Sequence, residues 1–448
     1  MRNVDEQKTP SKIIPIIIFI LAFSSMFLGF YRNQWRMAGK TKFSLFQKDV
    51  EGYVIARMVW SRQHGLLSNG GLLGWGDVNP EDINEADYQN QYEVYLQGLS
   101  FKTYWQKESH PGFQGLFFSI LDRLSPFTPL NNFRLFRMFT SGLFALTLAG
   151  LVLWFYGETG WLSALFVLLS ILTSQWMTVF GRNLFFVSGF FYLPMLVLLF
   201  QLQREKAGHK LSYAQLFGLV FAFILLKCMF NGYDFILPTL GMVASPLLFY
   251  GVLEKWNRDL FIKRFVIVVI AALTAIFFSF VVLSLQLAHS IGGFQDGINA
   301  IIKTINIRTI ASDQSLPTFD VNVARASYWS ILKIYLSESY FLNLQVPYFA
   351  IMIGFAVFSL VYVTLVRSRS APNRSLRGDA LLATTWLSLL SPLSWYIIFK
   401  SVSYYHTHMN YLPWHMPFTL FGFGLCGYII ETIFSQLKSK TSIVSKPH

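Results

Sequence analysis

Residues 13–31 read IIPIIIFILAFSSMFLGFY and contain no charged side chain. At a rise of about 1.5 Å per residue, a helix of this length reaches across the ~30 Å hydrocarbon core of a bilayer. The run is too long for the apolar part of a cleaved signal peptide, and no small-x-small cleavage site follows it. We therefore expect a retained transmembrane helix here.

Nine further apolar runs are long enough to span a bilayer, which predicts an all-α polytopic membrane protein with about ten transmembrane helices. Of the 448 residues, 54% are hydrophobic and only 13% are charged, against about 25% charged in soluble domains. This composition excludes a water-soluble enzyme, a disordered protein and a disulfide scaffold, and predicts one integral-membrane domain over residues 1–448. The nine runs are 138–157, 159–180, 184–203, 211–230, 233–253, 265–288, 346–366, 380–399 and 411–432.

The connections between spans indicate the orientation, because cytoplasmic connections are enriched in Lys and Arg. With ten spans, both terminal tails and the linkers 204–210, 254–264 and 367–379 fall on one side, so we expect both termini in the cytoplasm. The formal net charge of +13 then mostly reflects the Lys and Arg residues of the cytoplasmic segments. We therefore expect membrane lipid and no nucleic acid as a partner. The basic residues of these segments are Arg2, Lys8, Lys12, Arg204, Lys206, Lys210, Lys255, Arg258, Lys263, Arg264, Arg367, Arg369, Arg374, Arg377, Lys438, Lys440 and Lys446.

The opposite face then carries two large loops, residues 32–137 and 289–345. In the first loop, residues 46–60 and 112–124 have apolar side chains at helical spacing, which predicts two amphipathic helices near the membrane interface. An acidic segment lies between them. A solvated loop explains these acids best, since their spacing matches no divalent-ion pattern. They are Asp77, Glu81, Asp82, Glu85 and Asp87.

Asp49 and Glu51, at the start of the first amphipathic helix, are the candidate catalytic residues. If both are helical, their side chains point roughly 200° apart and cannot share one site. A carboxylate near the membrane surface can act as a general base. It can equally be a first-turn charge that interacts favourably with the helix dipole, and for Asp49 both interpretations stay open.

Other polar residues on the same face are candidates for binding a substrate. Glu108 and His110 precede the Pro111-Gly112 pair, and the alternative interpretation of this stretch is a simple turn. Arg182 either anchors a helix end or holds a phosphate, and Lys227 has the same two interpretations, with Asp234 as its expected partner. The set is Glu108, His110, Arg182, Lys227, Tyr233 and Asp234.

His406 and His408 lie in the last outer tip, with His415 close by. Neutral imidazoles can bind zinc, but an i, i+2 pair with no cysteine nearby is a weak metal pattern. Hydrogen bonding to a substrate phosphate or sugar is the better interpretation, with plain interfacial packing as the alternative. The two cysteines, Cys228 and Cys426, lie inside apolar runs, and no metal site is assigned.

The chain resembles the GT-C superfamily, integral-membrane glycosyltransferases that use polyprenyl-phosphate-linked sugars. An apolar first span, a large outer loop with amphipathic helices and an early acid are shared with that superfamily. The matching stretches also resemble bacterial members that glycosylate O-antigen, the outer part of lipopolysaccharide, or other surface glycans. These stretches are residues 46–53 (FQKDVEGY), 109–112 (SHPG), 181–183 (GRN), 232–235 (GYDF) and the His406/His408 tip.

The resemblance implies an inverting transfer at the periplasmic face of a bacterial inner membrane. Asp49 would be the catalytic base, with Glu51 as a rival because many members have two adjacent acids. The acceptor would be a glycan or a lipid-linked glycan. Some members need a divalent metal and others do not, so no cofactor is assigned. Candidates for stabilising the leaving polyprenyl phosphate are Arg182, Lys227, His406 and His408.

Three other functions fit the same distribution of residues. A secondary transporter or flippase of lipid-linked glycan usually places charges at mid-membrane and is built of repeats, neither of which is visible here. An O-antigen ligase or polymerase typically has its large outer loop late in the chain, whereas the largest one here comes first. A non-enzymatic assembly partner is the third alternative.

Overall fold

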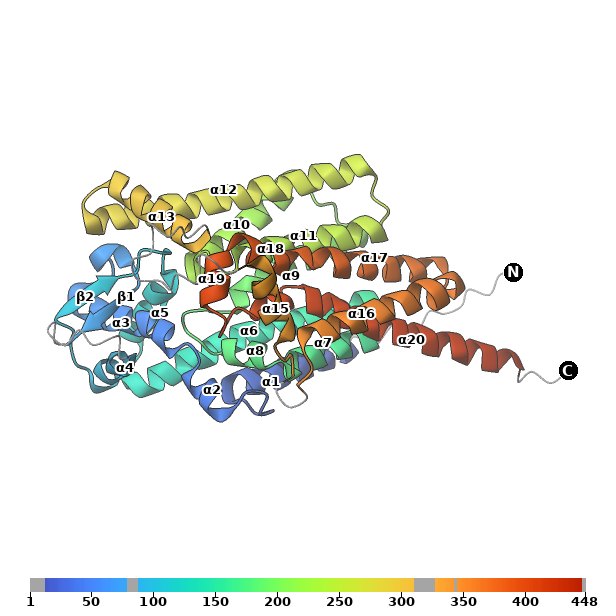
Figure 1. Cartoon of the computed structure of the whole chain (residues 1–448), viewed down its shortest axis with the longest axis horizontal. Helices are drawn as coiled ribbons and strands as arrows, with labels where there is room; N and C mark the ends of the chain where they lie inside the picture. The colour runs from blue at the N-terminus through green and yellow to red at the C-terminus, as the bar shows by residue number, and fades with distance from the viewer. Residues whose placement is uncertain (1–12, 79–87, 310–326, 342–344, 445–448) are drawn as a thin grey trace.

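Figure 1 shows the computed structural model, which describes residues 13–78, 88–309, 327–341 and 345–444. Eight of its helical segments are long and apolar enough to cross a membrane, so the chain is a helical, multi-pass membrane protein. Each overlaps one predicted span, with ends that in most cases differ by several residues. They are α1 (Ile13–Arg32), α6 (Pro129–Thr159), α10 (Tyr213–Asn231), α11 (Ile236–Leu253), α12 (Arg258–Ile291), α16 with its last turns (Tyr348–Val361, then Tyr362–Val366 and Arg367–Arg369), α17 with α18 (Pro372–Ser388 and Leu390–Ile398) and α20 (Phe418–Val444).

The other two predicted spans, 159–180 and 184–203, have different structures. The first is divided at Ser174, whose hydroxyl accepts the backbone N–H of Met177 at 3.3 Å and caps a second, short helix. The second is a single helix that ends in the charged run Arg204-Glu205-Lys206. The helices concerned are α7 (Trp161–Thr173), α8 (Gln175–Phe180) and α9 (Gly189–Lys206).

Most side chains of α6, α11 and α20 are buried, so these helices form the interior of the bundle. Around them, α1 packs along α6, α7 along α20, and α10 along α12. The connections from α11 to α12 and from α16 to α17 lie at the end where α20 leaves the bundle (Figure 1). The first loop lies at the opposite end, next to the turn between α12 and the following helix, α13 (Phe294–Thr309).

The first loop folds into a small unit that also contains a short two-stranded sheet, which the sequence analysis did not predict. Its strands pair antiparallel with Gly74 opposite Gln106. The pairing depends on glycine, since a Cβ at Gly74 would lie 2.4 Å from the Tyr104 ring. The elements of the unit are α2 (Lys40–Leu45), α3 (Lys48–His64), η1 (Ser68–Gly71), β1 (Gly74–Asp77), α4 (Tyr88–Gln97), β2 (Thr103–Gln106) and α5 (Phe113–Leu124).

The helix predicted over 46–60 forms as α3, but it is not an amphipathic surface helix. Its residues from Val54 to Val59 are all buried, so every side of the helix is covered. Arg57 is fully buried and donates to the carbonyl oxygens of Ser68 at 2.6 Å and Gly65 at 3.3 Å. These bonds satisfy a charge that burial alone would make costly, and α3 becomes the central helix of the unit.

The helix predicted over 112–124 forms as α5, with its polar side facing the protein. Buried Asp122 accepts Arg62 Nε at 2.6 Å and the Tyr95 hydroxyl at 2.7 Å. The apolar side faces outward, with Ile120 42% and Leu124 76% exposed. This inverted arrangement suits a helix whose outer side contacts lipid at the membrane interface.

Figure 1 shows α13, α15 (Tyr328–Ser337) and α19 (Lys400–Tyr405) toward the same end of the bundle as the first loop. A short helix, η4 (Leu412–His415), follows α19 in the chain. Of the acidic segment between the two predicted amphipathic helices, Asp77 accepts Trp105 Nε1 at 2.9 Å. Glu81, Asp82, Glu85 and Asp87 lie outside the described residues, as do Arg2, Lys8, Lys12, Lys446 and the side chain of Lys440.

Candidate active site

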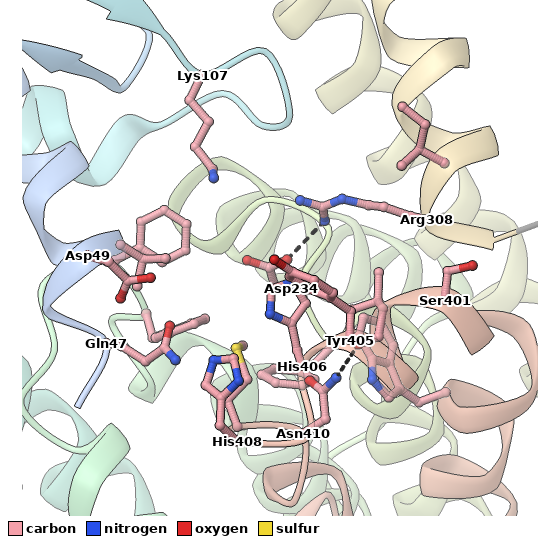
Figure 2. Close-up of a pocket in the computed structure, with 18 residues that line it drawn as sticks. Gln47, Asp49, Lys107, Asp234, Arg308, Ser401, Tyr405, His406, His408 and Asn410 are labelled. Atoms are coloured by element: carbon pink, nitrogen blue, oxygen red, sulfur yellow. Dashed lines mark hydrogen bonds and ion pairs between the residues drawn. The ribbon is translucent and has the colours of Figure 1, made fainter. Parts of the chain in front are cut away.

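A cavity of about 390 Å³, here called the polar cavity, lies where the first loop meets the helical bundle (Figure 2). Segments far apart in the sequence line it: the start of α3, the residues after β2, the tips before α9 and α11, the end of α13, and α18 to α19 with the turn after them. Its polar lining residues are Gln47, Asp49, Lys107, Asp234, Arg308, Ser401, Tyr405, His406, His408 and Asn410.

The two candidate acids occupy different environments. Asp49 is exposed and lines the polar cavity. Glu51 is 1% exposed and does not line it, because its carboxylate accepts Arg137 Nε at 3.3 Å, a second Arg137 N–H and the Tyr92 hydroxyl. Burial acts to raise the pKa of Glu51, but Arg137, the Tyr92 hydroxyl and the Leu184 N–H together lower it, and the net pKa shift is a lowering. Glu51 is therefore a structural partner of Arg137.

The tip between α8 and α9 holds the first turn of α3 in place. Glu51 Oε1 accepts the backbone N–H of Leu184 at 3.1 Å, and Asn183 Nδ2 donates to the Gln47 carbonyl at 3.2 Å. Asn183 is itself fixed, since its Oδ1 accepts the N–H of Phe185 at 2.8 Å. These bonds fix the backbone from which Asp49 projects into the cavity.

On the opposite wall, Arg308 at the end of α13 pairs with Asp234, with Nη1 3.1 Å from Oδ1 (Figure 2). The predicted ion pair between Lys227 and the Asp234 carboxylate does not form. Lys227 Nζ donates instead to the main-chain carbonyls of Gly232 at 2.8 Å and Asp234 at 2.7 Å. Lys227 thus shapes the tip before α11 and leaves the carboxylate to Arg308.

The electrostatics of the cavity follow from its burial. Burial lowers the pKa of Lys107 to about 8, and nearby Arg308 adds to the effect. Burial acts to raise the pKa of Asp234, but Arg308 and the other surrounding cations make the net shift a lowering. Burial also lowers the pKa of His406 to about 4, so this imidazole is neutral at pH 7. The cavity thus contains two basic side chains, Lys107 and Arg308, and two acidic ones, Asp49 and Asp234.

His110 lies behind this wall rather than in the cavity lining. It is buried, its ring meets Phe185 edge-on at 5.0 Å, and burial lowers its pKa to about 3. Among the described residues its Nε2 has no hydrogen-bond partner. His110 packs directly against Gly232, where an added Cβ would lie 2.2 Å from the Cβ of His110. Gly232 also has a φ of +55°, which favours glycine. His110 and the glycine together set the path of the tip that carries Asp234.

The histidine tip also contributes to the polar cavity. The rings of His406 and His408 meet edge-on with centroids 5.5 Å apart, and burial lowers the pKa of His408 as well. Within the part of the chain that the structure describes, no group of three or more His, Cys, Asp or Glu side chains could hold a metal ion.

The other candidates lie outside the polar cavity. Arg182 donates to the Phe43 carbonyl at 2.9 Å and lies over the Phe43 ring at 3.9 Å, so it fastens α2 to the bundle. Glu108 and Tyr233 line a second cavity of about 300 Å³, here called the apolar groove. The Tyr233 ring stacks on Phe280 there, with centroids 4.5 Å apart.

The apolar groove lies between α11, α12 and α13 and has an almost entirely aliphatic and aromatic lining. It adjoins the polar cavity at one residue, since Arg308 lines both. Lys107 and Arg308 were not among the sequence candidates. Nothing local marks them: Lys107 follows a short strand, and Arg308 ends a helix in the second loop. Only their positions at the cavity wall identify them.

Comparison with known proteins found no matching family model, no matching characterised protein and no matching solved structure.

Proposed function

We propose that this protein is a membrane glycosyltransferase that moves a sugar from a polyprenyl-phosphate donor to a hydroxyl of a glycan or lipid-linked glycan. The observation that carries the proposal is that Arg308 lines both the polar cavity and the apolar groove. A guanidinium at this junction suits a phosphate, because it offers several N–H donors in a planar fork. The lipid chain would then lie in the groove and the sugar in the cavity.

Asp49 is the general base of the proposed reaction. Its carboxylate accepts the proton of the acceptor hydroxyl while that oxygen attacks the anomeric carbon of the donor. The bond from the anomeric carbon to the phosphate oxygen breaks, and its electron pair leaves with the polyprenyl phosphate. Arg308 and Lys107 stabilise this developing charge. Figure 2 shows Asp49 and Arg308 on opposite sides of the cavity, which supports an in-line, inverting displacement.

The membrane arrangement belongs to the same proposal. We assign ten crossings, with α7–α8 and α9 added to the eight long spans, and both termini in the cytoplasm. The basic linkers before α12 and before α17 lie at the end opposite the polar cavity, which supports this orientation. The site then faces the periplasm of a bacterial inner membrane, where O-antigen and other surface glycans are modified.

The test is donor turnover by the purified full-length protein in lipid nanodiscs. Polyprenyl-phosphate sugars are supplied together with the surface glycan of the host cell, and both released polyprenyl phosphate and the new linkage are measured. We expect transfer with inversion by the wild type, loss of transfer in Asp49→Asn, and unchanged transfer in Asp296→Asn, whose carboxylate is exposed on α13 away from both cavities.

The same experiment separates the rival functions. A flippase would move the donor between leaflets and leave it intact, and a ligase or polymerase would transfer a whole glycan in place of one sugar. Absence of donor consumption across a panel of sugars and acceptors would refute the enzymatic proposal. Full transfer by Asp49→Asn would refute the assignment of the base.

A further inference from the structure

Asp49 lies between two cavities. On one side is the polar cavity with Lys107 and Arg308. On the other side is an open cleft of about 390 Å³ between α2, the start of α3 and the turn after α19, and Gln47, Asp49 and His408 line both. The base of the proposed reaction is therefore reachable from two directions.

The open cleft differs chemically from the apolar groove. Thr41, Gln47 and His408 give it hydrogen-bonding groups, and Lys42 adds an ammonium. Leu45 and Phe46 add some apolar surface, against which the face of a sugar ring can pack. Such a lining matches sugar hydroxyls, whereas the aliphatic and aromatic groove matches a hydrocarbon chain.

The cleft walls are held by the surrounding bundle. Lys42 Nζ donates to Gln175 Oε1 at 3.3 Å and lies 3.8 Å from the centre of the Trp176 ring. The Phe46 ring meets the Phe180 ring edge-on, with centroids 5.0 Å apart. A cleft fixed in this way is preorganised for a ligand, which lowers the cost of binding.

We infer that the open cleft is the acceptor subsite, and that the acceptor it takes is a carbohydrate chain that binds by its sugar residues alone. The inference rests on the proposed function, because it assigns the groove and Arg308 to the donor. Asp49 lines both cavities, whereas Arg308 lines the polar cavity and not the cleft, so a hydroxyl that enters from the cleft reaches Asp49 by a path separate from that of the departing phosphate. Donor and acceptor then use separate entrances.

The experiment measures acceptor binding directly, without donor. The probe is the surface glycan of the host cell, freed from lipid by mild acid, and binding to the full-length protein in nanodiscs is followed by ligand-observed NMR. Thr41→Trp fills the cleft from an exposed position on α2. Ser44→Trp, exposed on the same helix but outside the cleft, is the matched control.

We expect Thr41→Trp to weaken glycan binding at least about tenfold, with Ser44→Trp and the groove variant Leu273→Trp like the wild type. Equal binding by Thr41→Trp and the wild type would overturn the inference. So would binding that occurs only when the glycan keeps its lipid, or that is lost in Leu273→Trp, since the acceptor would then use the groove. Donor consumption in a separate assay reports on the proposed function, so the two failures are distinguishable.

Discussion

Arg308 Nη1 lies 3.1 Å from Asp234 Oδ1, and this ion pair joins the end of α13 to the tip between α10 and α11. The pair orients the guanidinium of a residue that lines both the polar cavity and the apolar groove. One bond to Asp234 leaves other N–H donors of the guanidinium for a phosphate.

Replacing this arginine tests its role in donor binding. We expect Arg308→Ala to raise the donor KM by roughly 10- to 100-fold, because a charge-assisted hydrogen bond to phosphate contributes about 1.5–3 kcal/mol. Steady-state transfer at varied donor concentration measures this change. Arg123→Ala, an exposed arginine on α5, is the control and leaves KM unchanged. An unchanged donor KM in Arg308→Ala would place the phosphate elsewhere.

The two acids near the start of α3 should respond differently to amide substitution. Asp49→Asn is expected to reduce transfer by about 10²- to 10⁴-fold with little change in thermal stability, because it removes a general base from an exposed side chain. Glu51→Gln breaks a buried ion pair with Arg137 and is expected to lower the free energy of unfolding by about 3 kcal/mol. Its activity should fall only as the folded fraction falls. Parallel turnover and thermal-unfolding measurements check both, and the reverse pattern would make Glu51 the base.

The pH dependence of kcat/KM for the donor should fall as Lys107 loses its proton, at a pH of about 8. The pKa of Lys107 is lowered on folding, so the unfolded chain binds this proton more tightly between about pH 8 and its ordinary value. The linkage therefore makes the folded state relatively more stable as pH rises through that window. Activity and stability change in opposite directions, which excludes unfolding as the cause. We expect Lys107→Arg to move the alkaline limb to higher pH, and an unmoved limb would exclude Lys107 as its origin.

Gly232 is expected to tolerate no side chain. Gly232→Ala would place a Cβ 2.2 Å from the Cβ of His110 at a φ of +55°, so we expect a loss of about 1–3 kcal/mol of stability and a displaced Asp234. Gly218→Ala, in open space on α10, is the control and should be neutral or stabilising by up to about 1 kcal/mol. Thermal unfolding of both variants in one detergent gives the comparison, and equal stabilities would contradict this account of the tip.

The apolar groove should distinguish donors by chain length. We expect Leu273→Trp, inside the groove, to raise KM for a long-chain polyprenyl donor and to leave a short-chain donor unaffected. Leu285→Trp, exposed on the same helix and outside the groove, should affect neither. The effect should disappear as isoprene units are removed from the donor. Equal changes for both chain lengths would show that the groove does not hold the chain.

The sequence by itself determined the class of the protein and the approximate positions of its long helices, whose ends in most cases differ by several residues from the predicted ones. Runs such as 13–31 and 233–253 have no stable alternative to a membrane-spanning helix, because apolar side chains and unpaired backbone groups exclude other structures in lipid. It did not show that 159–180 breaks at Ser174, since a helix cap depends on one local hydrogen bond. It also predicted an amphipathic surface for α3, whose packing on all sides depends on neighbours remote in the sequence.

Tertiary structure decided the candidate site. Asp49 was chosen from the sequence as an acid at the start of the first amphipathic helix, and Asp234 as the expected partner of Lys227. Only the folded structure shows that Glu51 pairs with Arg137 and that Arg308 pairs with Asp234. It also shows that Lys227 donates to main-chain carbonyls. Each of these contacts depends on how the folded chain places two groups in space, and neither composition nor sequence spacing predicts the distance between them. The chemistry available at the cavity depends on those contacts, because a charge acts on the groups within a few ångströms of it.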